Sequence, residues 1–452
     1  MLTYAVLVGL FLLIVVVFVY PKWGSFLVWP ILFTYPHYWW SRHQFLPLNI
    51  GMDDLFCVGL FLLIVFRRNF MEGQRVRFGF AFWSITMFVL VAAIANGVST
   101  LEARGPERML YLKDIMKLGV FWGLSYAILH SIDSKRDLRI QLTMFSLASA
   151  AGAAILILQY FFPAPMIHWS IPIAIKNVGI QEGGRAAGAF MNANSAACVL
   201  ACAVMLVTAT ITLQRTRLTK LFTYGIVGVL LVATMLARSR SGLLALTGAF
   251  VCMMLFGRSK RLAVMLVLGA VGVSMSFPLL SSQFSERIAA TYDPRSGDFG
   301  GSVLGRFRTW QSYFATATVA DYVIGQGSRH AIAKNHSESH NAYVSLITVY
   351  GVGGVIWAVA LCIVFRRKVR QTIACGDPLL SAVAGGCLFA LIAWGIYAFA
   401  SDAISAQYPR YVLFYLLVLI DRASVLARRE NLSAPAVQPV ESSATLYRAQ
   451  PA

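Results

Sequence analysis

The sequence predicts an all-α polytopic membrane protein with 12 or 13 transmembrane helices and one large loop on the outer side. Of the 452 residues, 58% are hydrophobic and only 13% are charged, which is about half the charged fraction of a soluble domain. The mean hydropathy is +0.69. Many apolar runs approach the length of about 20 residues that crosses a bilayer. This composition excludes a soluble nucleic-acid-binding protein despite the formal net charge of +19.

Each predicted span is a run of mainly apolar residues. The runs cover 2–20, 51–66, 78–95, 114–131, 139–162, 193–213, 221–237, 241–256, 262–280, 341–365, 379–400 and 408–421. Segment 23–40 is apolar but interrupted by Pro30 and Pro36, so it is a full span, a re-entrant hairpin or an interfacial segment. Residues 1–20 lack the basic start and cleavage site of a signal peptide and are expected to be retained.

Basic residues predict the orientation, because cytoplasmic loops are rich in Lys and Arg. Alternation of the spans places six short basic loops on one side, which is predicted to be cytoplasmic: 67–77, 135–139, 215–220, 258–261, 366–370 and 422–429. The N-terminus lies outside if 23–40 spans and inside if it does not. The outer side receives three longer connections, 96–113, 163–192 and 281–340.

The domain organisation follows from these runs. Residues 1–430 form one transmembrane helical domain, and residues 431–452, rich in Ala, Pro, Ser and Gln, are predicted to be a disordered cytoplasmic tail. The seven cysteines form no CxxC pair, and six of them lie in apolar runs. We interpret them as packing residues rather than as a disulfide framework or a metal site.

Arginines on the predicted outer side oppose the general trend. Arg185 lies in a Gly-rich stretch, Arg238 and Arg240 lie in a tight connection between two spans, and Arg306 and Arg308 lie in the large loop. Each could simply anchor a helix end or be solvated. However, Gly and Ser around Arg185 and Arg240 let a ligand approach closely. A guanidinium group also binds phosphate bidentately, through two parallel N–H···O hydrogen bonds. A lipid diphosphate at the outer leaflet is the predicted ligand.

The sequence shows no DxD or other paired-carboxylate cluster for a metal. Arginines are therefore predicted to neutralise the charge that develops on a leaving diphosphate, and no cofactor is expected. His340, at the start of an apolar helix, is the predicted base; its alternative role is a helix cap. Glu338 either orients that imidazole or is a solvated acid. His330 and His336 are interpreted as exposed loop residues.

A transporter would be expected to carry ionisable groups in mid-span. Lys117 is the clearest such group, and it could extend to the surface. The polar residues collect at the outer face instead, which disfavours a transporter or flippase for lipid-linked sugars and also a purely structural scaffold.

Four short motifs occur in a fixed order between residues 185 and 354. They are R-x-x-G-x-F-x-N-x-N from Arg185 to Asn194, S-R-S-G from Ser239 to Gly242, G-x-G from Gly325 to Gly327, and His340-Asn341 followed after nine residues by Gly351 and Gly354. Together they resemble the superfamily of bacterial O-antigen ligases and O-antigen or exopolysaccharide polymerases, with a core at about 185–365 that includes the loop 281–340.

The resemblance implies a GT-C-like fold and a metal-independent inverting glycosyltransferase in the bacterial inner membrane, with its active site facing the periplasm. The donor would be a glycan on undecaprenyl diphosphate, and the acceptor a sugar or lipid-linked glycan. Carried over by position, Arg185 and Arg240 would bind the diphosphate, and Arg306 or Arg308 would match a loop arginine. His340 would be catalytic, supported by Asn341, Glu338, Arg238 and Asn194.

Polymerase, ligase and protein oligosaccharyltransferase share this chemistry and differ in their acceptor. A polymerase uses a second undecaprenyl-linked repeat, and a ligase uses the lipid A–core sugar. The long aromatic N-terminal region favours a polymerase, while the His-Asn motif is typical of the ligase branch. The expected partners are the lipid-linked donor, the acceptor, the bilayer and a chain-length regulator, without nucleic acid.

Overall fold

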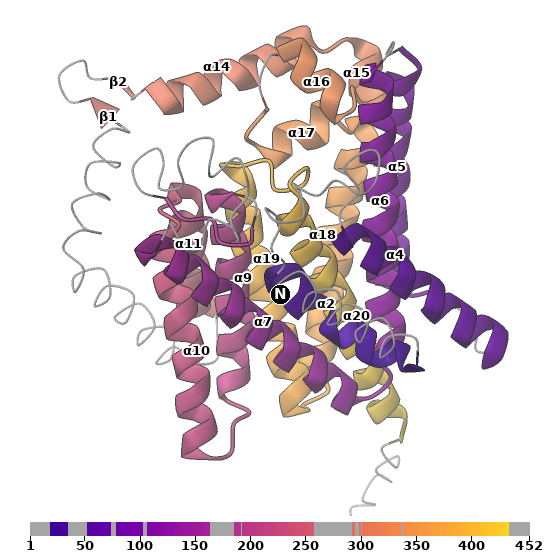
Figure 1. Cartoon of the computed structure of the whole chain (residues 1–452), viewed down its shortest axis with the longest axis vertical. Helices are drawn as coiled ribbons and strands as arrows, with labels where there is room; N and C mark the ends of the chain where they lie inside the picture. The colour runs from indigo at the N-terminus through magenta and orange to yellow at the C-terminus, as the bar shows by residue number, and fades with distance from the viewer. Residues whose placement is uncertain are drawn as a thin grey trace, which may run out of the picture.

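A computed structural model of the chain describes residues 19–34, 52–73, 78–102, 106–162, 185–190, 192–256, 292–293, 298–299, 301–335 and 338–433. These residues are mostly helical (Figure 1). In the first half of the chain the helices are α2 (Pro21–Thr34), α4 (Met52–Val65), the π-helix η2 (Phe66–Met71), α5 (Phe80–Glu102), α6 (Pro106–Ser131), α7 (Lys135–Phe161), α9 (Ala193–Ile211) and α10 (Arg217–Leu236).

The second half begins with α11 (Arg240–Phe256). Two short strands, β1 (Tyr292–Asp293) and β2 (Asp298–Phe299), pair antiparallel with Tyr292 opposite Phe299. The remaining helices are α14 (Gly301–Thr316), α15 (Val319–Ile324), α16 (Ser328–Asn335), α17 (Ala342–Thr348), α18 (Gly351–Ala374), α19 (Pro378–Phe399) and α20 (Gln407–Ser433).

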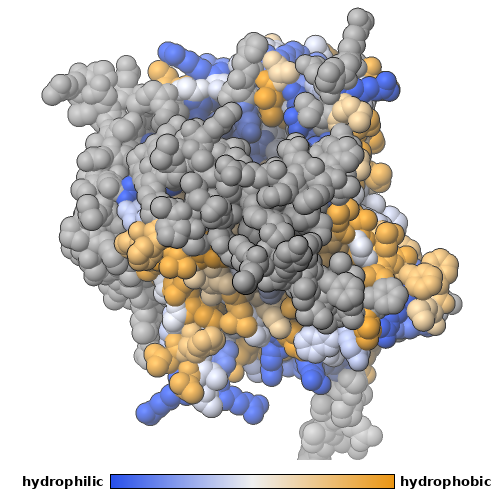
Figure 2. Space-filling view, in the orientation of Figure 1, coloured by the Kyte–Doolittle hydropathy of each residue, from blue (hydrophilic) through white to orange (hydrophobic). Residues whose placement is uncertain are grey.

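Five of the described helices, α5, α7, α9, α10 and α19, are long and apolar enough to cross a membrane. On the face seen in Figure 2, apolar residues lie at mid-height beside the grey atoms, and hydrophilic residues lie toward the top and bottom. Large exposed apolar side chains such as Leu90 on α5, Val251 on α11 and Ile363 on α18 belong to this surface. Because a soluble protein rarely exposes so much apolar area, the described chain is that of an α-helical membrane protein.

The described helices coincide with most predicted spans, with two corrections. Residues 341–365 do not form one helix, because the chain turns between α17 and α18 at Val349 and Tyr350. The predicted connection 96–113 is also wrong, since α5 continues to Glu102 and α6 starts at Pro106. The predicted spans 2–20 (except residues 19 and 20) and 262–280 lie outside the described residues. So does the predicted tail, apart from residues 431–433, which belong to α20.

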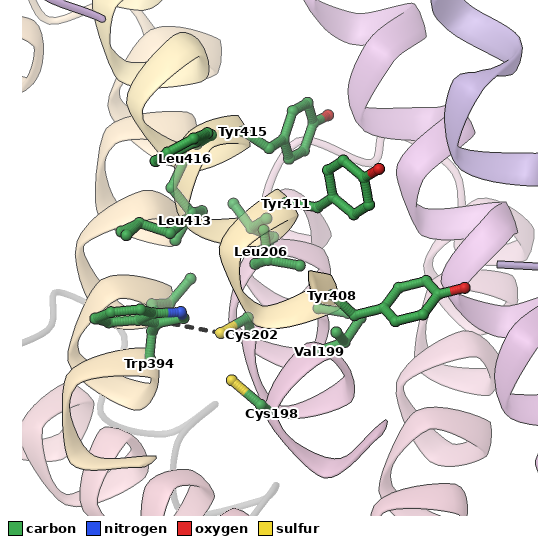
Figure 3. Packing of buried hydrophobic residues seen from close by; sticks show 14 of the residues in the cluster. Cys198, Val199, Cys202, Leu206, Trp394, Tyr408, Tyr411, Leu413, Tyr415 and Leu416 are labelled. Carbon is green, nitrogen blue, oxygen red and sulfur yellow. Dashed lines mark hydrogen bonds between the residues drawn. The ribbon is translucent and has the colours of Figure 1, made fainter. Parts of the chain in front are cut away.

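Helix α9 is the centre of the bundle. It packs against α7, α10, α11, α19 and α20. Of its most apolar stretch of 18 residues, 83% is buried, compared with 39% for the same length of α5. Its Cys198, Val199, Cys202 and Leu206 face α19 and α20 (Figure 3). The Cys202 thiol donates a hydrogen bond to the Ala390 carbonyl at 3.4 Å. Small side chains on α9 thus hold three helices close together, which fixes the positions of their ends.

Ion pairs join several helices at one end of the bundle, which we call the basic end. Lys22 pairs with Asp137 at 2.8 Å, Lys135 with Asp377 at 2.6 Å, and Lys368 with Asp421 at 3.1 Å. The three pairs link α2 to α7, α7 to the start of α19, and α18 to α20. The opposite end, where α14–α17 lie across the bundle (Figure 1), is called the loop end.

Candidate functional site

Two separate segments meet at the loop end through Asn194. Arg185 donates from Nε to the Ala237 carbonyl at 3.4 Å, and its Nη2 donates to the Asn194 Oδ1. The Ser239 hydroxyl donates to the same Oδ1 at 2.9 Å. Asn194 lies in the first turn of α9, which begins after Asn192 caps it by accepting from the Ser195 amide at 2.7 Å. The motifs around Arg185 and Arg240 therefore form one hydrogen-bonded unit.

The connection between α10 and α11 orients two arginines differently. Arg238 adopts a left-handed backbone with φ 48° and is only 2% exposed. Its guanidinium donates to the Tyr160 hydroxyl at 2.6 Å and lies 5.3 Å from the centre of that ring. Arg240 instead starts α11 and is half-buried. Arg238 thus supports the turn against α7, while Arg240 lies at the end of the bundle.

Arg306 approaches Arg240 from the loop. It lies on α14 and donates to the Ala400 carbonyl at 2.9 Å. Burial and the positive charge of Arg240 lower the pKa of Arg306, so Arg306 lies within the electrostatic reach of Arg240. Arg308 is exposed and lies two residues further along α14, on the opposite face of that helix. The structure brings together Arg185, Arg240 and Arg306, called the arginine cluster below, and leaves Arg308 outside it.

Trp310 connects the arginine cluster to the predicted catalytic histidine. It lies one turn after Arg306 on the same face of α14, and its Nε1 donates to the Ser339 carbonyl at 2.7 Å. Its ring packs edge-on against Phe399, with 5.8 Å between ring centres. The residue immediately before His340 is therefore fixed to the helix that carries Arg306.

His340 lies in a strained turn with its ring half exposed. Its φ is 50°, a value uncommon for residues other than glycine. Asn341 caps α17 by accepting from the Tyr343 and Val344 amides at 2.9 and 3.2 Å. The Glu338 carboxylate lies 4.0 Å from the His340 Nδ1. The capping role falls to Asn341, which leaves the imidazole, 45% exposed, available to a substrate.

Asp402 supports this turn, although in the sequence it is recognisable only as an acid between the last two predicted spans. The Ser339 and Ser345 hydroxyls are 2.8 Å apart, and the Ser345 hydroxyl donates to Asp402 at 2.8 Å. Burial raises the pKa of Asp402, while hydrogen bonds from Ser345 and Ser405 act against that change. Asp402 follows Ala400, the partner of Arg306, by two residues. The His340 turn and the arginine cluster therefore share the end of α19.

A glycine pair docks the loop onto the junction of α17 and α18. The Gln326 and Gly327 amides donate to the Thr348 and Val349 carbonyls at 3.0 and 3.1 Å. A Cβ on Gly351, whose φ is 63°, would lie 2.7 Å from the Gly325 nitrogen. Two motifs singled out in the sequence, G-x-G and the first glycine after His340, thus meet backbone to backbone.

The site combines a cluster of guanidinium groups with an accessible imidazole nearby. Such an arrangement can bind an anionic group and accept a proton beside it. His336 lies outside the described residues, and His330 is a half-buried residue of α16. Within the described ranges, no group of three or more His, Cys, Asp and Glu side chains could hold a metal ion. Neither a protein-family model nor a curated protein matches the chain.

Proposed function

We propose that this chain is a membrane glycosyltransferase that moves a glycan from undecaprenyl diphosphate to an acceptor sugar, as a polymerase in O-antigen or exopolysaccharide assembly. One observation carries the proposal: Arg185, Arg240 and Arg306 converge from three segments beside the turn that holds His340. In this proposal the enzyme has the 12 or 13 spans and the large periplasmic loop expected from the sequence. The loop end then faces the periplasm of a bacterial inner membrane.

The arginine cluster would hold the donor diphosphate. Guanidinium groups stay charged when partly buried and offer paired N–H donors to phosphate oxygens. Arg306 already donates to a neutral carbonyl, so its charge is not cancelled by that contact. Positive charge fixed next to the leaving group stabilises the charge that develops there. Lipid-linked donors suit this position, because their tails remain in the bilayer.

His340 would act on the acceptor. In the proposed step, an acceptor hydroxyl oxygen attacks the anomeric carbon of the donor sugar and forms the new glycosidic bond. The bond from that carbon to the diphosphate oxygen breaks, and the electron pair leaves with the diphosphate. The hydroxyl proton passes to the His340 imidazole and from there to solvent. A single displacement of this kind inverts the anomeric configuration.

An activity assay tests the proposal. Purified full-length protein in lipid nanodiscs is supplied with an undecaprenyl-diphosphate repeat unit. We expect a ladder of products without added acceptor and without added metal. His340→Ala should reduce the rate by about 10²- to 10⁴-fold, the contribution of a positioned general base. His330→Ala, at a half-buried histidine of α16, serves as the control. Activity that survives loss of His340, or that disappears with a chelator, contradicts the mechanism. Transfer only to lipid A–core would identify a ligase.

A further inference from the structure

A cavity is lined by residues of α16 and by Val349 and Tyr350, between α17 and α18. Its volume is about 520 Å³, within the range of small-molecule sites. Helix α6 forms one wall with Asp114, Lys117, Leu118 and Phe121, which recur at the spacing of one helix face. We call it the α6 cavity. None of the three arginines of the cluster is among the described residues that line it.

The α6 cavity and the arginine cluster share their dividing walls. Asn192 and Ser195 line the cavity, and Asn194 between them accepts from Arg185. Asp402 lines the cavity, two residues after the carbonyl that accepts from Arg306. Glu338 lines it as well, 4.0 Å from the imidazole of His340. A molecule in the cavity would thus lie next to the residues that hold the His340 turn and the arginine cluster.

Two of the three cations in the cavity are engaged with the protein. Arg329 holds Asp114 through two contacts, 2.6 and 3.1 Å long. Arg410 donates to the Ile404 and Ser405 carbonyls, both at 2.6 Å, and lies over the Phe121 ring. The third cation is Lys117, and among the described residues no carboxylate lies within ion-pair distance of it.

The charge around Lys117 favours an anion. Lys113 precedes it by one turn of α6 and lies just before the predicted span. Burial and the positive charges of Lys117 and Arg329 lower the pKa of Lys113. Three acids of the described chain line the cavity. Asp114 binds Arg329, Asp402 accepts hydrogen bonds from Ser345 and Ser405, and the Glu338 side chain is 63% exposed. An ionisable group at membrane depth is usually functional.

The remaining lining suits a sugar ring. Asn192 and Gln407 supply amide groups and Ser195 supplies a hydroxyl. Tyr313 and Tyr350 supply aromatic surface. Polar groups of this kind bind hydroxyls with defined directions, and aromatic rings pack against apolar C–H faces. We propose that the α6 cavity binds the acceptor sugar and that Lys117 binds a carboxylate carried by that sugar. This inference rests on the proposed transferase function.

The site can be tested without any donor. Saturation-transfer NMR measures the binding of sodium D-glucuronate and of D-glucose to the purified full-length protein in detergent. We expect glucuronate to bind roughly 10-fold or more tightly than glucose, the size of one charge-assisted hydrogen bond. Lys117→Met should abolish the difference while leaving glucose binding unchanged, and Lys117→Arg should restore it. Lys220→Met, which removes an exposed lysine of α10, is the charge control.

A kinetic experiment connects the site to transfer. With a lipid-linked repeat that ends in glucuronate, Lys117→Met should raise the KM for acceptor by about 10-fold with kcat retained. Loss of a lysine with only a structural role would not raise KM while leaving kcat unchanged. Equal binding of the two sugars, or a preference that persists in Lys117→Met, overturns the inference even if transfer occurs. If glucuronate selectivity is present but the unmodified protein transfers nothing, the proposed function fails and the carboxylate site stands.

Discussion

Three lysines at the basic end and Arg306 of the arginine cluster at the loop end have different partners. At the basic end, Lys22, Lys135 and Lys368 each pair with a carboxylate on another helix. At the loop end, Arg306 donates to a backbone carbonyl and has a second guanidinium group nearby. Pairing with an acid cancels charge, whereas a neutral oxygen positions a cation and leaves its field in place. The basic end is therefore expected to support stability, and the loop end to bind an anion.

Two arginines on one helix give the strongest test of this difference. Arg306→Ala should lower the rate of glycan transfer by about 10²- to 10³-fold, because it removes a donor from the developing negative charge. Arg308→Ala, on the exposed face of α14, should change the rate less than about 3-fold, the usual scale for a solvated charge. Rates measured in nanodiscs with matched amounts of folded protein decide the question. Equal losses of rate in both variants would show that the net positive charge of α14 matters and that the position of Arg306 does not.

Lys368→Met tests the opposite end. Asp421 is a buried partner, 1% exposed, and without the lysine its carboxylate stays unpaired in an apolar surrounding. We expect a loss of about 3 kcal/mol in the free energy of unfolding, measured by SDS titration in mixed micelles. Turnover per folded molecule should be unchanged. A variant that keeps its stability but loses turnover would mean that the basic end is coupled to the reaction.

Gly351→Ala tests whether docking of the loop positions His340. An added Cβ would lie 2.7 Å from both the Gly325 nitrogen and the Val323 carbonyl oxygen, at a φ of 63°. Strain of this kind costs about 2 kcal/mol, and we expect transfer to fall along with thermal stability. Gly385→Ala is the control, because a Cβ there has open space around it. Transfer equal to that of the unmodified protein would separate the docking from the reaction.

Asp402 should give the smallest effect, a change in how stability depends on pH. Burial raises the pKa of its carboxyl in the folded protein. The folded state therefore holds this proton more tightly than the unfolded chain, and the contribution of Asp402 to stability is lost as pH rises through the folded pKa. Asp402→Asn removes the titration and still offers an oxygen to Ser345. Melting temperatures between pH 4 and pH 8 should vary less in this variant than in the unmodified protein.

Much of the helical frame could be predicted, because apolar runs of bilayer length identify spans without tertiary information. The extension of α5 could not, since it depends on contacts far along the chain. Asn96 accepts from the Ser328 amide and hydroxyl, both at 3.0 Å, and these contacts hold the helix end beyond its apolar run. The break at Val349 and Tyr350 was missed because the apolar pattern continues through it.

For the site, the residue types were predictable and their directions were not. Arg306 and Arg308 are equivalent in composition and lie two residues apart, so only the docking of α14 distinguishes them. Arg238 and Arg240 differ in the same way, because the left-handed backbone of Arg238 directs it to Tyr160. Lys117 stood out in the sequence as an ionisable mid-span residue, but the cavity around it is assembled from seven separate segments of the described chain, 96, 114–121, 192–195, 313, 328–338, 349–350 and 402–410.

The glycine contact between the loop and the α17–α18 junction has a consequence for how such a chain can diversify. The two segments are aligned by hydrogen bonds from the Gln326 and Gly327 amides to the Thr348 and Val349 carbonyls. No side chain takes part in these bonds. Substitutions of the side chains around this junction therefore leave these backbone bonds in place. A side chain added at Gly325 or Gly351 acts on them directly, because its Cβ would lie within 3 Å of backbone atoms of the other segment.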